Sequence, residues 1–381
     1  MDRQAGRSTR VVGLTILALL VAAWPAASVG MVVYSNDMEK GIGKEWSLRR
    51  IEATPRGDRR FLGRFRHERV GLKVAALPRH AWLRVSFELL VMGTWDGNAG
   101  HTPRRAVNPV GPDGWRMGIE GGATLVDATF SNLDFETRQA EEAARTQSYP
   151  SVLLGESRPA KTGAAERNTL GCQWVFDGVP RAVDSVYAMS FVIPHEAGAV
   201  ALYFEGGSGL QPNDDECWGL RNVRVEALGA EEVSKLDEDQ MRRLWEAVGG
   251  RDPVAESEAF WRLVAGGNET ARFLRGRVNR LGVDRARFAS LVAELDGNDF
   301  AARERATAAI RAMGPGAAPL VREAIERADS AEVRGRLAGV LKGIGSTPVT
   351  DPQTRRSMIA VRLLGVIGTA EARRVAGELG G

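Results

Sequence analysis

Three short segments place acidic side chains beside glycine and tryptophan. They are Thr94-Trp95-Asp96-Gly97-Asn98, Gly111-Pro112-Asp113-Gly114-Trp115 and Asp214-Asp215-Glu216-Cys217-Trp218-Gly219. Asp and Asn next to a glycine can direct oxygens out of a tight turn, which is the type of ligand that calcium prefers. Tryptophan offers a flat apolar face, either to a sugar ring or to the protein core. The segments therefore predict either a cation or ligand site, or turns and core packing alone.

Two sets of residues follow from these segments. The expected ligand-binding residues are Trp95, Asp96, Asn98, Trp115 and Trp218. The expected ligands of a calcium ion, at most one per chain, are Asp96, Asn98, Asp113 and Asp215. We expect no other cofactor.

Residues that would support catalysis are few. The four histidines, His67, His80, His101 and His195, have no metal-ligand spacing, and the chain has no HExxH, GxSxG, Walker or dinucleotide motif. A pair of carboxylates, as in glycoside hydrolysis, is the remaining option. Its candidates are Asp96, Glu120, Asp215 and Glu216. We therefore expect a non-catalytic protein, with a glycoside hydrolase as the alternative.

The overall charge argues against a nucleic-acid partner. The 381 residues include 51 Lys and Arg against 48 Asp and Glu, a net charge of only +3. At the N-terminus, Arg3, Arg7 and Arg10 precede the apolar run 11–23. This run is short for a bilayer span but fits an export signal covering residues 1–30. We expect a periplasmic, cell-surface or secreted protein, and an uncleaved N-terminal anchor is the alternative and the only expected membrane contact.

The two cysteines, Cys172 and Cys217, both lie in the tryptophan-rich first half. In an exported protein a disulfide between them is one expectation. Two buried thiols are the other.

The segment 31–228 has the pattern of an all-β domain. Its apolar runs are short, and Leu83, Val85, Phe87 and Leu89 alternate with polar residues, as in a strand with one buried face. The expected strands are 32–34, 61–65, 70–74, 82–92, 115–119, 124–130, 185–193, 200–204 and 219–225. About nine strands predict a lectin-like or jelly-roll β-sandwich. An insertion near 132–168 is expected to contain a short helix over 135–146, or to be a disordered loop.

After about residue 230 the apolar period becomes helical. We expect a linker at 229–236 and an all-α domain at 237–381, with helices near 300–313, 319–328, 330–344, 352–367 and 370–379. Asn298 or Asp299 is the expected N-cap of the first of these. Short helices joined by tight turns predict a HEAT-like α-solenoid.

The first half resembles a lectin-like β-sandwich module found in exported, planctomycete-type bacterial proteins. The resemblance rests on Tyr34-Ser35-Asn36-Asp37-Met38-Glu39, Phe61-Leu62-Gly63-Arg64-Phe65, Thr94-Trp95-Asp96-Gly97-Asn98, Gly111-Pro112-Asp113-Gly114-Trp115 and Glu216-Cys217-Trp218-Gly219-Leu220-Arg221-Asn222-Val223. Similar modules carry an acid at the position of Arg221 and a small residue at that of Cys217. If that acid helps to bind a structural cation, Arg221 is expected to pair with Asp37 or Glu39 instead.

The second half looks like the HEAT-like segment of planctomycete-type proteins. The similar segments include Ala259-Phe260-Trp261-Arg262-Leu263 and Asp299-Phe300-Ala301-Ala302-Arg303-Glu304. The resemblance implies an interaction scaffold and carries over no catalytic residue. Together the two halves predict a binding or scaffold protein, in which the sandwich binds carbohydrate or a cell-surface component and the helices bind a protein. A purely structural envelope protein is the alternative.

Overall fold

A computed structural model describes residues 30–99, 111–140, 142–153, 156–207, 209–211, 215–233, 235–250, 252–275, 277, 285–297, 299–313, 317–344 and 352–380. The expected export signal, His101 and Asp214 lie outside these residues. Within them, no helix has both the length and the apolarity needed to cross a bilayer.

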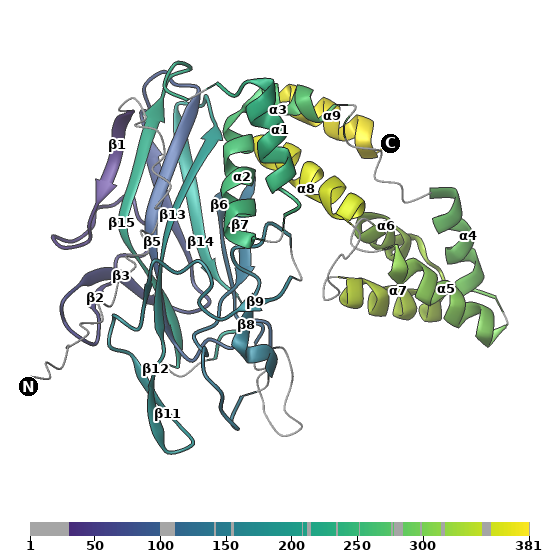
Figure 1. The fold of residues 1–381 in the computed structure, drawn as a ribbon, viewed down its shortest axis with the longest axis horizontal. Coiled ribbons are helices and arrows are strands. Elements are labelled where there is room, and N and C mark those ends of the chain that lie inside the picture. Colours follow the sequence, from purple (N-terminus) through teal and green to yellow (C-terminus); the bar gives the residue numbers. More distant parts are fainter. Residues whose placement is uncertain are drawn as a thin grey trace, which may run out of the picture.

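All nine expected strands are present, and they form two main sheets (Figure 1). The larger sheet has the order β10-β13-β5-β15-β3-β2, with β1 paired to β15, and the smaller has the order β4-β14-β6-β7. The bounds of these strands are β1 Met31–Asn36, β2 Ile51–Ala53, β3 Arg60–Phe65, β4 Arg69–Ala75, β5 Trp82–Gly93, β6 Gly114–Ile119, β7 Thr124–Thr129, β10 Glu166–Arg167, β13 Asp184–Pro194, β14 Ala199–Gly206 and β15 Glu216–Leu228.

Aromatic side chains from the two sheets meet in the sandwich core. The rings of Phe87 in β5 and Phe204 in β14 lie edge to face with centroids 5.4 Å apart. Trp115 in β6 and Trp218 in β15 do the same at 5.9 Å. Such edge-to-face pairs add stability to the area that each ring buries. The alternation in β5 predicted from the sequence therefore does face a shared core.

Between β7 and β13 the chain makes a long excursion from the sandwich. It contains the 3-10 helix η1 (Glu142–Arg145), the short pair β8 (Thr146–Gln147) and β9 (Arg158–Pro159), and the hairpin β11 (Gln173–Phe176) and β12 (Val179–Ala182). The helix expected over 135–146 is therefore confined to four residues. The β11–β12 hairpin projects from one end of the sandwich (Figure 1).

The second half is helical, as expected. The helices are α1 Glu238–Ala247, α2 Pro253–Ala265, α3 Gly267–Leu274, α4 Arg285–Leu295, α5 Phe300–Ala312, α6 Ala318–Arg327, α7 Ala331–Ile344, α8 Pro352–Ile367 and α9 Ala370–Gly380. The side chain of Asp299 caps α5 by accepting a hydrogen bond from the Ala301 N–H, as predicted.

These helices pack in two groups. Helices α4 to α7 share one apolar cluster, whereas α8 and α9 return to pack on α2 and α3 (Figure 1). The arrangement differs from a linear solenoid, in which each helical pair contacts only its sequence neighbours. Of the two returning helices, α8 contacts β13 of the sandwich, whereas α9 packs on α3 and α8.

One hydrophobic core continues from the sandwich into α1, α2, α3, α8 and α9. Phe191 of β13 and Trp261 of α2 lie edge to face, with centroids 4.5 Å apart. Leu236, in the segment expected as a linker, is buried in the same core. Arg355 of α8 makes ion pairs with Glu156 at 2.7 Å and with Glu256 of α2 at 2.6 Å. The two parts of the chain are thus joined by apolar and ionic contacts.

Candidate metal centre

Three carboxylates distant in the sequence meet at one end of the sandwich. β15 pairs with β5 so that Glu216 lies opposite Gly93, which places Glu216 near Asp96 just beyond β5. Asp113, just before β6, donates its backbone N–H to the Gly97 carbonyl at 2.9 Å. Strand pairing and one turn contact therefore bring Asp96, Asp113 and Glu216 together.

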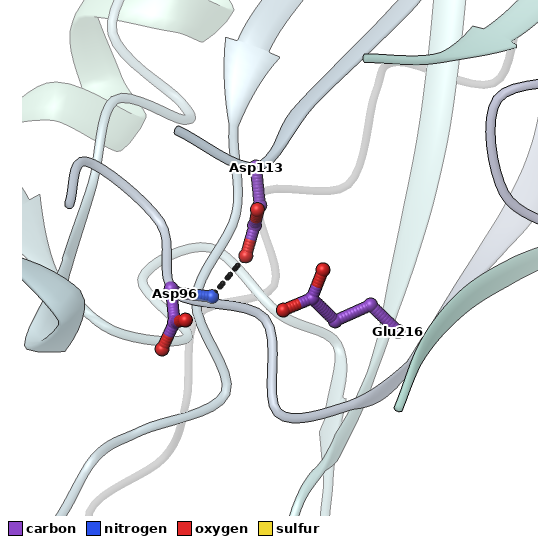
Figure 2. Close-up of side chains that lie close together, drawn as sticks. All are labelled: Asp96, Asp113 and Glu216. Atoms are coloured by element: carbon purple, nitrogen blue, oxygen red, sulfur yellow. Dashed lines mark hydrogen bonds between the residues drawn. The ribbon is translucent and has the colours of Figure 1, made fainter. Parts of the chain in front are cut away.

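The carboxylate oxygens of these residues form a compact cluster. One oxygen from each of Asp96, Asp113 and Glu216 lies within 4.8 Å of the other two. Figure 2 shows the carboxylates of Asp113 and Glu216 directed toward each other, with Asp96 beside them. Asp113 and Glu216 are completely buried. The Asp113 Oδ2 accepts a hydrogen bond from the Asp96 N–H, whereas its Oδ1 is buried and has no hydrogen-bond partner among the described residues.

The electrostatics of this cluster are unfavourable for three charged carboxylates. Burial raises the pKa of Asp113 well above its usual range, and the nearby charges of Glu216, Asp96 and Asp215 raise it further. Burial also raises the pKa of Glu216 to about 8. The groups that raise these pKa values are carboxylates, so a positive charge among them would be strongly stabilised.

The dimensions of the cluster fit a calcium ion. Ca²⁺ binds carboxylate oxygens at about 2.3–2.6 Å, so two ligands on opposite sides of one ion lie at most about 5 Å apart. The 4.8 Å spread of the three oxygens satisfies this limit. A bound cation would also give the buried Asp113 Oδ1 a partner, which it otherwise lacks. Asp96, Asp113 and Glu216 are thus suitable calcium ligands.

Two of the four residues expected to bind calcium, Asp96 and Asp113, lie in the cluster, whereas Asn98 and Asp215 do not. The Asn98 side chain is held elsewhere, because its amide donates to Thr146 Oγ1 at 3.2 Å and its Oδ1 accepts from Thr129 Oγ1 at 2.5 Å. Asp215 accepts a hydrogen bond from the Thr94 hydroxyl. Glu216, which the sequence suggested as a hydrolytic carboxylate, is the third member of the cluster.

The carboxylates suggested for glycoside hydrolysis differ in their exposure to solvent, and Asp96 and Asp215 are partly buried. Glu120 is exposed and pairs with Arg69 at 2.9 Å. Glu216 is completely buried. A glycosidic bond must reach both carboxylates of a hydrolase, so the buried Glu216 does not suit that role.

The three tryptophans expected to bind a ligand are core residues. Trp95, Trp115 and Trp218 are each completely buried, and their rings pack on other aromatic side chains of the sandwich. Trp95 Nε1 donates to the Met92 and Cys217 carbonyls. No ring face is left for a sugar, so this prediction was wrong.

A tryptophan outside the predicted site is exposed. Trp174 in β11 is 44 % exposed, and it is the one exposed tryptophan among the described residues. Its cross-strand neighbour is Arg181 of β12. The hairpin tip is fixed because Asp177 accepts hydrogen bonds from the Thr137 hydroxyl and the Arg138 N–H. The dipeptide Asp177-Gly178 after a β run was the signal for this hairpin, because both residues adopt positive φ in its turn.

The two cysteines are close together, yet no disulfide joins them. Both contribute to one apolar cluster beside β3 and β13, and burial raises the pKa of the Cys172 thiol to about 12. Of the two expectations from the sequence, the disulfide is therefore not present, and that of two buried thiols holds in part, because Cys217 is buried and Cys172 is partly buried. The expected partner of Arg221 is confirmed, because its guanidinium lies 3.2 Å from the Glu39 carboxylate.

Comparisons with known proteins add little. No family model matches the chain, and no curated protein matches it. The carbohydrate-binding module of Cellvibrio mixtus lichenase 5A, solved with cellotriose, is 11 % identical over 51 % of this chain and 98 % of its own, with a TM-score of 0.22. The N-terminal CBM22-1–CBM22-2 tandem domain of Paenibacillus barcinonensis Xyn10C is 11 % identical, and the match covers 54 % of this chain and 48 % of that chain, with a TM-score of 0.21. Similarities this weak do not assign a function, and the planctomycete-type and HEAT-like resemblances stay predictions.

Proposed function

We propose that this protein is an exported, non-catalytic binding protein whose β-sandwich is stabilised by a calcium ion at Asp96, Asp113 and Glu216. The observation that carries the proposal is the fully buried Asp113 carboxylate, with one oxygen lacking a hydrogen-bond partner beside two further acids. Burying an unpaired charge costs several kcal/mol, and a bound cation removes that cost.

The proposed ligand is a carbohydrate, bound at the β11–β12 hairpin. The exposed Trp174 ring supplies an apolar face for a pyranose ring, and Arg181, directly opposite it on β12, supplies hydrogen-bonding groups beside it. The contacts of Asp177 with the loop 137–138 hold the hairpin in place, so that little conformational entropy is lost on binding.

Export and the role of the helices belong to the same proposal. Export rests on the basic and apolar N-terminal residues 1–30. The proposed protein partner of the helical half contacts α4 to α7, which form a cluster separate from the core shared with the sandwich.

Glycan binding separates this proposal from a purely structural role. The parent protein is applied to a glycan array in calcium and compared with the Trp174→Ala variant and with Phe300→Ala, which removes an exposed aromatic ring in α5. We expect one or more glycans to bind the parent and Phe300→Ala, and to lose at least tenfold in affinity for Trp174→Ala. Absence of glycan binding in the parent would favour the structural role. Release of new reducing ends from a bound glycan would instead support the hydrolase alternative.

A further inference from the structure

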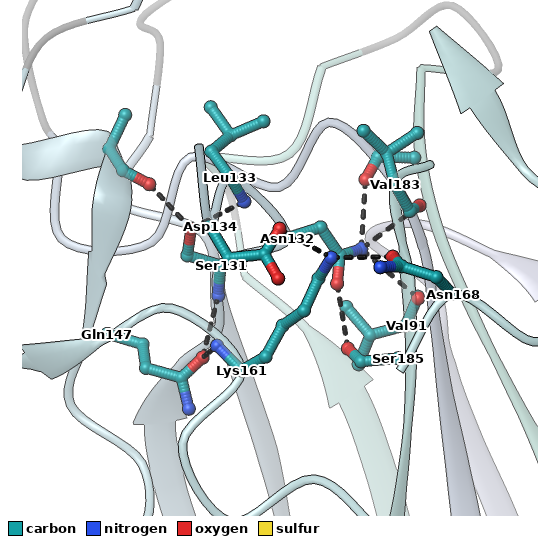
Figure 3. Close-up of polar contacts among 12 residues, drawn as sticks. Val91, Ser131, Asn132, Leu133, Asp134, Gln147, Lys161, Asn168, Val183 and Ser185 are labelled. Carbon is teal, nitrogen blue, oxygen red and sulfur yellow. Dashed lines mark hydrogen bonds and ion pairs between the residues drawn. The ribbon is translucent and has the colours of Figure 1, made fainter. Parts of the chain in front are cut away.

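A lysine is completely buried in the excursion between β7 and β13. The side chain of Lys161 has no exposed surface, and its Nζ donates to Asn168 Oδ1 at 2.7 Å and to Asp134 Oδ1 at 2.9 Å. Figure 3 shows the three side chains converging from separate turns of the backbone. A buried lysine is uncommon and needs partners. This one has a single carboxylate and a single amide.

The surrounding backbone fixes these groups relative to one another. The Lys161 N–H donates to Gln147 Oε1 at 2.9 Å, and the same oxygen accepts from the Ser131 N–H at 3.2 Å (Figure 3). The Asn168 N–H donates to the Asp184 carbonyl at 3.0 Å. The backbone of Lys161 is therefore held by a buried glutamine, and that of Asn168 by the first residue of β13.

This arrangement has the components of an amide-forming reaction. An amine that hydrogen-bonds to the Asn168 Oδ1 at 2.7 Å lies less than about 4 Å from the amide carbon, since a C=O bond is about 1.2 Å long. Burial lowers the pKa of Lys161, which favours the neutral amine that a nucleophile requires. The Asp134 carboxylate, at hydrogen-bond distance, is the base that accepts its proton.

We propose that Lys161 Nζ and Asn168 Cγ form an intramolecular isopeptide bond, with Asp134 transferring the proton. Asp134 takes a proton from the ammonium, and the amine attacks Asn168 Cγ to form a C–N bond. The Asn168 Cγ–Nδ2 bond then breaks, and Nδ2 takes one proton from Asp134 and one from the attacking nitrogen and leaves as an ammonium ion, which restores the Asp134 carboxylate. One side-chain amide is consumed and one amide is formed, so the reaction needs no oxidant or reductant.

The bond closes a covalent ring over residues 161–168. This segment contains β10, which pairs with β13 at the edge of the larger sheet. Edge strands are the part of a sheet that most readily frays or pairs with another chain. The cross-link holds β10 in place and supplies to this region the covalent bond that the cysteines do not.

Tryptic mapping of the full-length protein tests the bond. Unmodified protein is cleaved after Arg145, Lys161, Arg167 and Arg181, and it releases 146–161, 162–167 and 168–181 as separate peptides. The isopeptide blocks cleavage at Lys161 and joins 146–167 to 168–181 in one species, lighter by about 17 Da for the ammonia lost. We expect this linked species in the parent. Recovery of the three separate peptides from folded, aged protein would overturn the proposal.

Matched variants distinguish the cross-link from other reactions that release ammonia. A succinimide at Asn168 also loses about 17 Da, but it leaves Lys161 cleavable, and finding it would count against the cross-link. Lys161→Arg keeps a cation and Asn168→Ala removes the amide, and neither variant should give a linked species. Asp134→Asn should slow linkage at least tenfold in protein whose circular dichroism matches the parent. Linkage at the parental rate would remove Asp134 from the reaction.

Discussion

Phe191 of the sandwich and Trp261 of helix α2 lie edge to face with ring centroids 4.5 Å apart, inside a core that both halves of the chain share. Each ring covers apolar surface that would otherwise face water. The sandwich and the helices α1 to α3, α8 and α9 are therefore expected to unfold as one cooperative unit.

Trp261→Ala tests this coupling. The variant should lose roughly 3–5 kcal/mol of unfolding free energy, because it removes a large buried ring and leaves a cavity between the two parts. Strand and helix signals in circular dichroism should fall together at a lower temperature. The exposed Phe300→Ala should change stability by less than about 0.5 kcal/mol. A helical transition that separates from an unchanged strand transition would contradict the shared core.

Replacing Arg355 is expected to lower the free energy of unfolding more than replacing either of its carboxylate partners. It lies between Glu156 and the buried Glu256, so Arg355→Met leaves two carboxylates facing each other and should cost roughly 3–5 kcal/mol. Glu256→Gln leaves the arginine paired with Glu156 and should cost less. Urea unfolding of both variants gives the order, and a larger loss for Glu256→Gln would contradict this account of the interface.

The two cysteines should behave as buried thiols. The raised pKa of Cys172 leaves almost no thiolate at pH 8, and thiolate is the form that reacts with disulfide reagents such as DTNB. Native protein should therefore react slowly with DTNB, and unfolded protein should give two thiols per chain. Finding no thiols after unfolding without reductant would show that the disulfide forms.

The strands could be predicted from the sequence because local patterns determine them. The alternation of Leu83, Val85 and Phe87 predicted β5, and the cap at Asp299 predicted the start of α5. The direction in which α8 and α9 return was not predictable. An apolar helical stripe shows that a face is covered, but not which of several apolar surfaces covers it.

The site was partly predictable for a similar reason. Asp113 and Glu216 each lie two positions before a core tryptophan, Trp115 and Trp218, so they share the inward face of their strands. That spacing was the available signal, and it distinguishes Glu216 from its neighbour Asp215. The sequence could not show whether the tryptophan rings face solvent or the core. The turns beside them have the same residue types in a ligand site and in a turn that only supports core packing.

The buried Glu216 carboxylate also predicts how the stability of the metal-free protein depends on pH. Without metal, the folded-state pKa of Glu216 is about 8, above its ordinary value of 4.5, so the folded state holds this proton more tightly than the unfolded state. The resulting stabilisation is complete below about pH 4.5 and is lost as the pH rises to about 8. In chelator, the melting temperature should therefore receive a falling contribution from Glu216 over this range, and Glu216→Gln should remove it. Equal slopes for parent and variant would contradict the raised pKa.

The most direct test is the melting temperature of the parent protein at pH 7.5, in EDTA and in millimolar calcium. At a calcium concentration about 100 times its Kd, the ion adds about 2.7 kcal/mol and should raise the melting temperature by roughly 5 °C. Asp113→Asn should abolish the shift, whereas Asn98→Ala should retain it because Asn98 is bonded elsewhere. The same melting temperature in EDTA and in calcium would contradict the proposed metal centre.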